Sequence, residues 1–166
     1  MAARAAILNL QVALALFSGS VACVRVDGGA IEADWVLRTF DGRSILGCGC
    51  ADPAIAHVRF SARPIDTAGA SGDDICSGRT DCEFSCGSLR GATPFFVPPG
   101  RYALAITPVD ASGQALPGGV GKGYVRVPAP ILRDVVNGQP VELDALAIET
   151  SCAATCGGDV ASRSCE

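Results

Sequence analysis

Charged residues and histidine are scarce in this chain of 166 residues. The 13 Lys and Arg and the 17 Asp and Glu make up 18% of the residues, the net charge is −4, and there is one His. Because hydrophobic residues reach 49%, the composition excludes an intrinsically disordered chain and a basic chain that binds nucleic acid. The 20 Gly and 10 Pro follow no strict triplet, which excludes collagen, and they interrupt the chain so often that short strands are favoured over long helices.

Catalytic motifs are missing as well. The chain has no G-x-S-x-G nucleophile elbow and no C-x-x-C redox pair. In the glycine-rich segment 118–123, Lys122 is followed by Gly123 instead of the Ser or Thr of a phosphate-binding loop, so we expect a hairpin loop there. His57, the single candidate for a catalytic imidazole, falls on the outward face of an expected strand, where we expect a solvated side chain. We therefore predict that the chain is not an enzyme and carries no cofactor.

The N-terminus has the order of an export signal. Arg4 is the first charged residue, an apolar stretch runs from Ala5 to Phe17, and small residues lead to Cys23. The apolar stretch is shorter than the roughly 20 residues that a membrane-spanning helix needs, and it suits a signal peptide over residues 1–22.

This leader, with Ser20-Val21-Ala22-Cys23 at its end, resembles that of bacterial prolipoproteins. The resemblance implies cleavage before Cys23, lipidation of Cys23, and a short tether over residues 23–29. Since Val24 is not the aspartate that retains such proteins in the inner membrane, it also implies an exported, lipid-anchored protein of the outer membrane. Ser20 stands where the family has Leu, Val or Ile, so an ordinary secretory cut after Ala22 stays open.

Cysteine parity agrees with a lipidated Cys23. Without that residue an even number is left, which lets an exported protein close four disulfides with no thiol left over. Four thiolates on a zinc ion are an alternative, but the spacings Cys82-x₃-Cys86 and Cys152-x₃-Cys156 differ from the usual C-x₂-C, so we expect no metal. The expected disulfide cysteines are Cys48, Cys50, Cys76, Cys82, Cys86, Cys152, Cys156 and Cys165.

Alternating apolar and polar residues predict half-buried strands over 31–40, 55–63 and 101–109. Asp41-Gly42 and Asn137-Gly138 carry hairpin turn chemistry, so we expect 43–47 to pair with the first strand and 131–136 to pair with 141–148. Shorter strands are expected near 81–86, 93–97, 114–116 and 124–127.

The stretch from Val97 to Leu116, VPPGRYALAITPVDASGQAL, resembles a hairpin of immunoglobulin-like and prealbumin-like sandwich domains. The resemblance implies an all-β, Greek-key or immunoglobulin-like β-sandwich and no particular function. We expect one such domain over residues 30–149, followed by a cysteine-rich tail over residues 150–166.

Candidate ligand residues are few. Asp73 and Asp74, in the polar loop 64–80, are the best pair for a hard cation, but two carboxylates are few beside the roughly 6 to 8 oxygens that Ca²⁺ takes. Trp35 lies on the apolar face of its strand, so we expect it in the core and not against a sugar. Glu32 with Asp34 and Glu142 with Asp144 are expected to be solvated pairs.

The sequence as a whole predicts a cell-envelope lipoprotein that acts as a binding or structural module, with the membrane as one partner and an envelope protein or polysaccharide as another. Two alternatives are a secreted carbohydrate- or cation-binding module and a secreted hydrolase or inhibitor.

Overall fold

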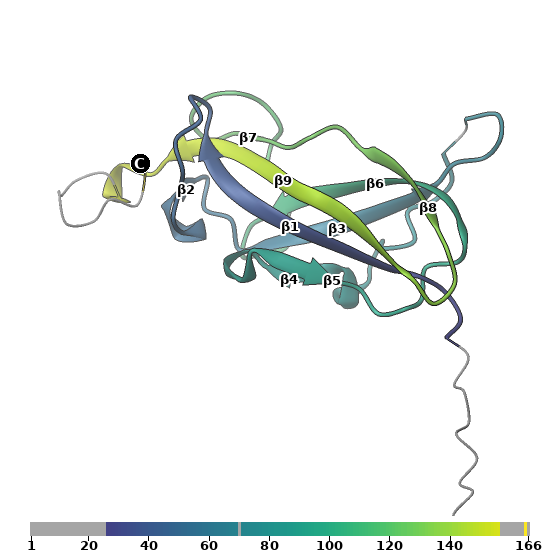
Figure 1. The fold of residues 1–166 in the computed structure, drawn as a ribbon. Helices are drawn as coiled ribbons and strands as arrows, with labels where there is room; N and C mark the ends of the chain where they lie inside the picture. Colours follow the sequence, from purple (N-terminus) through teal and green to yellow (C-terminus); the bar gives the residue numbers. More distant parts are fainter. Residues whose placement is uncertain (1–25, 70, 157–164, 166) are drawn as a thin grey trace, which may run out of the picture.

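The computed structural model describes residues 26–69, 71–156 and 165, so the predicted signal peptide and Cys23 lie outside the described residues. Two β-sheets pack face to face, with strand order β2-β9-β1-β5 in the first sheet, where β7 also pairs with β9, and β4-β3-β6-β8 in the second (Figure 1). The single all-β sandwich predicted from the sequence is therefore confirmed. No helix among the described residues is long and apolar enough to cross a membrane.

The strands are β1 (Ala30–Thr39), β2 (Ala51–Asp52), β3 (His57–Pro64), β4 (Glu83–Ser85), β5 (Arg90–Ala92), β6 (Gly100–Val109), β7 (Val125–Arg126), β8 (Ile131–Val135) and β9 (Pro140–Cys152). Short 3₁₀ turns are η2 (Cys48–Cys50), η3 (Thr80–Cys82), η4 (Cys86–Ser88) and η5 (Ala154–Cys156). The chain crosses repeatedly between the sheets, because β1, β2, β5, β7 and β9 belong to the first sheet and β3, β4, β6 and β8 to the second. Such crossings between sheets are typical of Greek-key sandwiches.

The longest strands alternate as their sequences predict. In β3 the side chains of Val58, Phe60 and Ala62 are buried, while the residues between them are partly or fully exposed. This period of two follows from the pleat, which turns successive side chains to opposite faces of a strand. Between the sheets, the rings of Trp35 and Phe60 meet edge to face with centroids 6.4 Å apart.

The first and last long strands are neighbours in the first sheet, which the sequence did not predict. β1 and β9 pair in parallel from Ala30 opposite Pro140 to Thr39 opposite Thr150, with a register shift between Ala33 and Trp35. β9 continues to Cys152, so the sandwich extends past residue 149 into the segment expected to be a tail.

The hairpin predicted at Asn137-Gly138 is wrong. β8 pairs with β6 and β9 pairs with β1, so this turn carries the chain from one sheet to the other. Its polar groups bind the start of the described chain instead. The Gly28 amide donates to Oδ1 of Asn137, and the Gly138 amide donates to the carbonyl oxygen of Gly28.

Three short predicted strands also differ from the structure. The strand expected over 93–97 lies earlier, as β5, and only Val97 makes an isolated bridge, with Gly29. The segments 43–47 and 114–116 form isolated bridges, Arg38 with Ser44 and Val109 with Ala115, and no strand of their own. Both are the returning arms of tight turns, at Asp41-Gly42 and at residues 110–113, and each arm is hydrogen-bonded through its backbone to the strand that precedes its turn.

Four disulfides hold the sandwich, and all eight cysteines predicted to pair are in them. Each joins Cα atoms 5.6 to 6.4 Å apart, within the usual range for a bridge. The bridges are Cys48–Cys86, Cys50–Cys156, Cys76–Cys82 and Cys152–Cys165.

Candidate functional site

The side chain of Trp35 is only 1% exposed, which confirms that it belongs to the core. Its indole Nε1 donates a 3.0 Å hydrogen bond to the carbonyl oxygen of Cys86. The ring therefore has no face free for a sugar.

The loop carboxylates Asp73 and Asp74 differ in their exposure and in their contacts. Asp73 is exposed, whereas Oδ1 of Asp74 accepts hydrogen bonds from the amides of Ala62 at 2.8 Å and Cys76 at 3.0 Å. The carboxylate of Asp74 thus fastens the loop to the end of β3. Among the described residues no group of three or more His, Cys, Asp or Glu side chains is placed to hold a metal ion.

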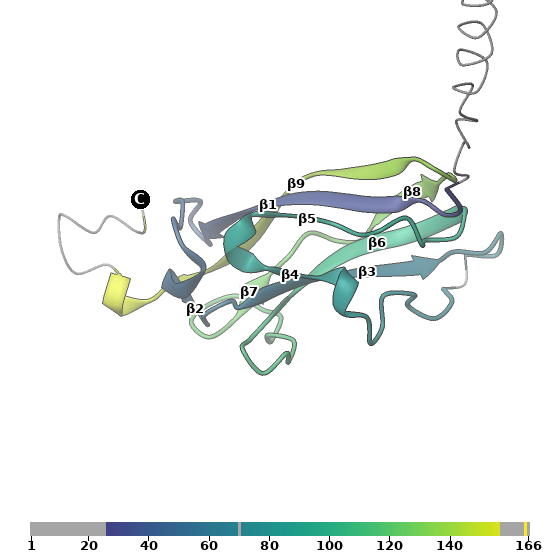
Figure 2. The same cartoon turned by 90° about the horizontal axis from the view of Figure 1, so that it is seen from below.

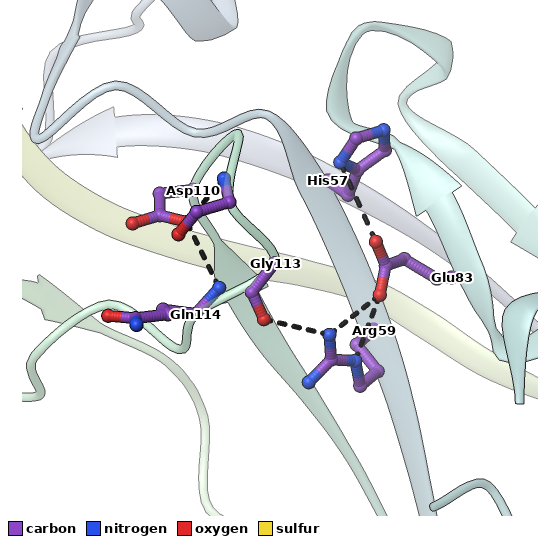
Figure 3. A network of polar contacts seen from close by, with 7 residues as sticks. His57, Arg59, Glu83, Asp110, Gly113 and Gln114 are labelled. Atoms are coloured by element: carbon purple, nitrogen blue, oxygen red, sulfur yellow. Dashed lines mark hydrogen bonds and ion pairs between the residues drawn. The ribbon is translucent and has the colours of Figure 1, made fainter. Parts of the chain in front are cut away.

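The most developed polar network lies on the outward face of the second sheet. Arg59 donates from Nε and Nη2 to Oε2 of Glu83, at 3.0 and 2.7 Å, and Nδ1 of His57 lies 3.7 Å from the other carboxylate oxygen (Figure 3). Nη2 of Arg59 also donates to the carbonyl oxygen of Gly113, in the turn after β6. Glu83 is therefore shared by two cationic side chains when His57 is protonated.

Strand register assembles this network. β3 and β4 pair antiparallel with Arg59 opposite Glu83 and His57 opposite Ser85, so the three charged side chains emerge on one face. The sequence placed His57 and Arg59 correctly on the outward face but gave them no partner. Glu83 lies in the short strand expected near 81–86, and its acidic side chain was the only sign of a partner in the sequence. Its pairing with Arg59, 24 residues earlier, depends on the register of the two strands.

The turn that receives Arg59 is organised by Asp110. Oδ1 of Asp110 accepts hydrogen bonds from Ser112 and from the amide of Gln114 (Figure 3). The hydrogen bond from the Ser112 side chain, followed by that from the Gln114 amide, lowers the pKa of Asp110 below its ordinary value. These hydrogen bonds hold the turn that presents the Gly113 carbonyl oxygen to Arg59.

A surface hollow of about 490 Å³ opens beside the network, and its lining adds three residues that could not be singled out from the sequence, Gly78, Arg79 and Thr80. Arg79 forms a two-point contact with Asp81, and its guanidinium lies 3.7 Å from the centroid of the Phe96 ring. The hydrogen bonds between Arg79 and Asp81 raise the pKa of Arg79 and lower the pKa of Asp81. Both arginines of the hollow are thus already paired with carboxylates. The lining residues are His57, Arg59, Gly78, Arg79, Thr80 and Glu83.

The fold brings three of the four residues of the remaining acidic pairs to one hollow. Glu32 and Glu142 face each other across the β1–β9 ladder, and with Asp34 and Arg90 they line a shallow hollow of about 190 Å³. Asp144 does not line that hollow and lies 4.0 Å from Nη2 of Arg133.

Beside the larger hollow, the ion pair of Arg59 with Glu83 joins β3 to β4. The close polar partner of the His57 side chain is the carboxylate of Glu83. The glycine-rich segment 118–123 forms turns that are closed by an isolated bridge of Gly118 with Val125. Nζ of Lys122 lies 4.0 Å from a carboxylate oxygen of Asp52.

Comparison of the chain with protein-family models, with curated proteins and with solved structures finds no match.

Proposed function

We propose that this chain is an exported lipoprotein whose β-sandwich is a binding or structural module held at a membrane surface by lipid on Cys23. The observation that carries the proposal is the pairing of the cysteines. All eight that follow Cys23 form disulfides with one another, so none of them is available to Cys23, which lies outside the described residues. Disulfides persist in oxidising compartments, where an odd cysteine needs its own explanation. Acylation at the end of a leader gives one.

The disulfides of the sandwich are suited to a compartment outside the cytosol. Cys50–Cys156 spans 106 residues and Cys152–Cys165 attaches the last cysteine to the end of β9, so both fasten the C-terminal segment to the sandwich. A crosslink over a long loop removes much of the entropy of the unfolded chain. We infer that the bridges keep the domain folded where no cytosolic chaperone is present.

The outward face of the second sheet supports a binding role over a catalytic one. The charged side chains around the 490 Å³ hollow neutralise one another in pairs, Arg59 with Glu83 and Arg79 with Asp81. Such a surface recognises polar partners by exchanging hydrogen bonds, and it offers no activated nucleophile. An envelope protein or a polysaccharide is the class of partner that this proposal gives to the face.

Metabolic labelling tests the anchor. The full chain is expressed with its own leader in a bacterium that is fed a radiolabelled fatty acid, beside the variants Cys23→Ser and Cys165→Ser. We expect label on the wild type and on Cys165→Ser, which loses a disulfide but keeps the leader cysteine, and none on Cys23→Ser. An unlabelled wild-type protein of mature size in the soluble fraction would overturn the proposal in favour of plain secretion.

A further inference from the structure

Three exposed apolar side chains surround the point where the described chain begins. Val26 is 42% exposed, Phe95 is 42% exposed and Val136 is 48% exposed. They come from the start of the chain, from the link between β5 and β6, and from the turn between β8 and β9. Single exposed apolar residues are ordinary, but three on neighbouring segments call for an explanation.

Backbone contacts show that the three segments are fastened together. Gly29 exchanges hydrogen bonds with Val97, its amide donating to the Val97 carbonyl oxygen at 2.8 Å and its own carbonyl oxygen accepting from the Val97 amide at 3.1 Å. On the other side, the Gly138 amide donates to the Gly28 carbonyl oxygen at 2.7 Å. The segment 26–29 is therefore held between the other two by backbone hydrogen bonds.

Glycine makes this close approach feasible. A Cβ atom on Gly29 would lie 2.4 Å from Cγ1 of Val135 and 2.9 Å from the Val136 carbonyl oxygen. A Cβ atom on Gly28 would lie 3.0 Å from the main-chain carbon of Phe96. The backbone at the exit point thus runs directly against the two segments that carry Phe95 and Val136.

The length of the tether brings this corner to the bilayer. Cys23 stands three positions before Val26, and a fully extended chain spans at most about 3.3 to 3.6 Å per residue, so the linkage reaches about 10 Å. We propose that Val26, Phe95 and Val136 form a contact patch for the lipid surface, which fixes the corner of the sandwich at the start of β1 against the membrane. This inference rests on the proposed lipid anchor at Cys23 and goes beyond it, because an anchor alone leaves the orientation of the domain open.

The opposite end of the sandwich provides a matched control. β1 begins near the β8–β9 turn and the β5–β6 link, whereas the segment 41–50 and η5 lie at the far end (Figure 1, Figure 2). Leu46, in that far segment, is 71% exposed and is thus more available to solvent than any residue of the patch. If exposure alone governed lipid contact, Leu46 would touch the bilayer as readily as Phe95.

Quenching of fluorescence by brominated phospholipid tests the orientation. The chain has one tryptophan, the buried Trp35, so the variants Phe95→Trp, Val136→Trp and Leu46→Trp each add a single exposed indole to the same background. Each full-length protein is purified in detergent, its mass is measured to establish lipidation, and it is reconstituted into vesicles with bromine near the top of the acyl chains. Circular dichroism identifies any variant that fails to fold. Because two patch variants are made, the test still works if one of them does not fold.

We expect the emission added at positions 95 and 136 to fall roughly twofold, since interfacial contact places side chains within the outer 5 to 10 Å of the acyl boundary, and the emission added at position 46 to stay unchanged. If the proteins are lipidated but position 46 is quenched as strongly as positions 95 and 136, or none is quenched, the patch is overturned while the anchor stands. If the mass shows no lipid, the anchor itself fails, and the patch fails with it.

Discussion

The indole nitrogen of Trp35 lies 3.0 Å from the carbonyl oxygen of Cys86, and this hydrogen bond joins β1 of the first sheet to the turn that follows β4 of the second. Both residues are almost fully buried, and Cys86 is also bonded to Cys48. The centre of the core is thus held by packing, by a hydrogen bond and by a covalent bridge at one place.

Replacing Trp35 with Phe tests this centre. The variant loses one hydrogen bond, worth about 0.5 to 1.5 kcal/mol, and leaves a small void of similar effect, so we expect the free energy of unfolding to fall by about 2 kcal/mol. The Cys86 carbonyl keeps its second donor, the Leu89 amide at 3.1 Å, which prevents a larger loss. Urea denaturation monitored by circular dichroism measures the change.

The matched control is Val36→Thr, at the next position of β1 and on the exposed face. We expect it to change the free energy of unfolding by no more than about 0.5 kcal/mol. Equal effects of the two substitutions would contradict the central role given to Trp35.

The strands that could be predicted from the sequence are those with one buried face. Alternation is a local signal, so β1, β3 and β6 were found close to their observed bounds. The parallel pairing of β1 with β9 leaves no local trace, because it joins residues more than a hundred positions apart. Asn137-Gly138 was misread for the same reason. Its turn chemistry is correct, but Gly28, which hydrogen-bonds to the turn, lies more than a hundred positions earlier in the sequence.

Only part of the candidate site could be predicted from the sequence. The outward placement of His57 and Arg59 follows from alternation, whereas their meeting with Glu83 depends on the register of β3 with β4. The eight cysteines could be assigned to disulfides by parity and compartment, but their connectivity depends on which loops lie side by side. Cys50 and Cys156 illustrate this, since 106 residues separate them.

The disulfides are expected to contribute unequally. Cys50–Cys156 closes a loop of 106 residues and Cys76–Cys82 closes one of 6, and chain entropy predicts stabilisation of about 5 kcal/mol and about 2 kcal/mol respectively. Replacing both cysteines of each bridge by Ala should therefore lower the free energy of unfolding more for the long bridge. A larger loss from the short bridge in urea titrations would show that burial of its sulfurs, and not chain entropy, dominates.

The contact between Gly29 and β8 predicts a steric effect. Gly29→Ala would place a methyl group 2.4 Å from Cγ1 of Val135, and overpacking of this kind costs about 1 to 3 kcal/mol. Gly47→Ala is the control, because a Cβ there meets no atom within 4 Å. Thermal denaturation should show a lower melting temperature for the first variant only. Unchanged melting of both would mean that segment 26–29 is not held as described.

The turn after β6 predicts a dependence on pH. The hydrogen bond from Ser112 and the amide of Gln114 lower the pKa of Asp110 from its ordinary value of 3.8 in the folded state. A group whose pKa is lowered on folding stabilises the protein above its unfolded pKa, and this contribution is lost as the pH falls through the folded pKa. We expect wild type to exceed Asp110→Asn in stability near pH 6 and the difference to vanish in strong acid. A difference that is independent of pH would exclude a role for the charge.

Intact mass spectrometry of the full chain, expressed in a bacterium with its own leader and extracted in detergent, tests the assignment of all nine cysteines together. We predict a chain that begins at Cys23, is heavier by a diacylglycerol and a fatty acyl group, and gains nothing from thiol alkylation under denaturing, non-reducing conditions. A chain without lipid that takes up the alkylating reagent would contradict the lipoprotein assignment and leave Cys23 as a free thiol of a secreted protein.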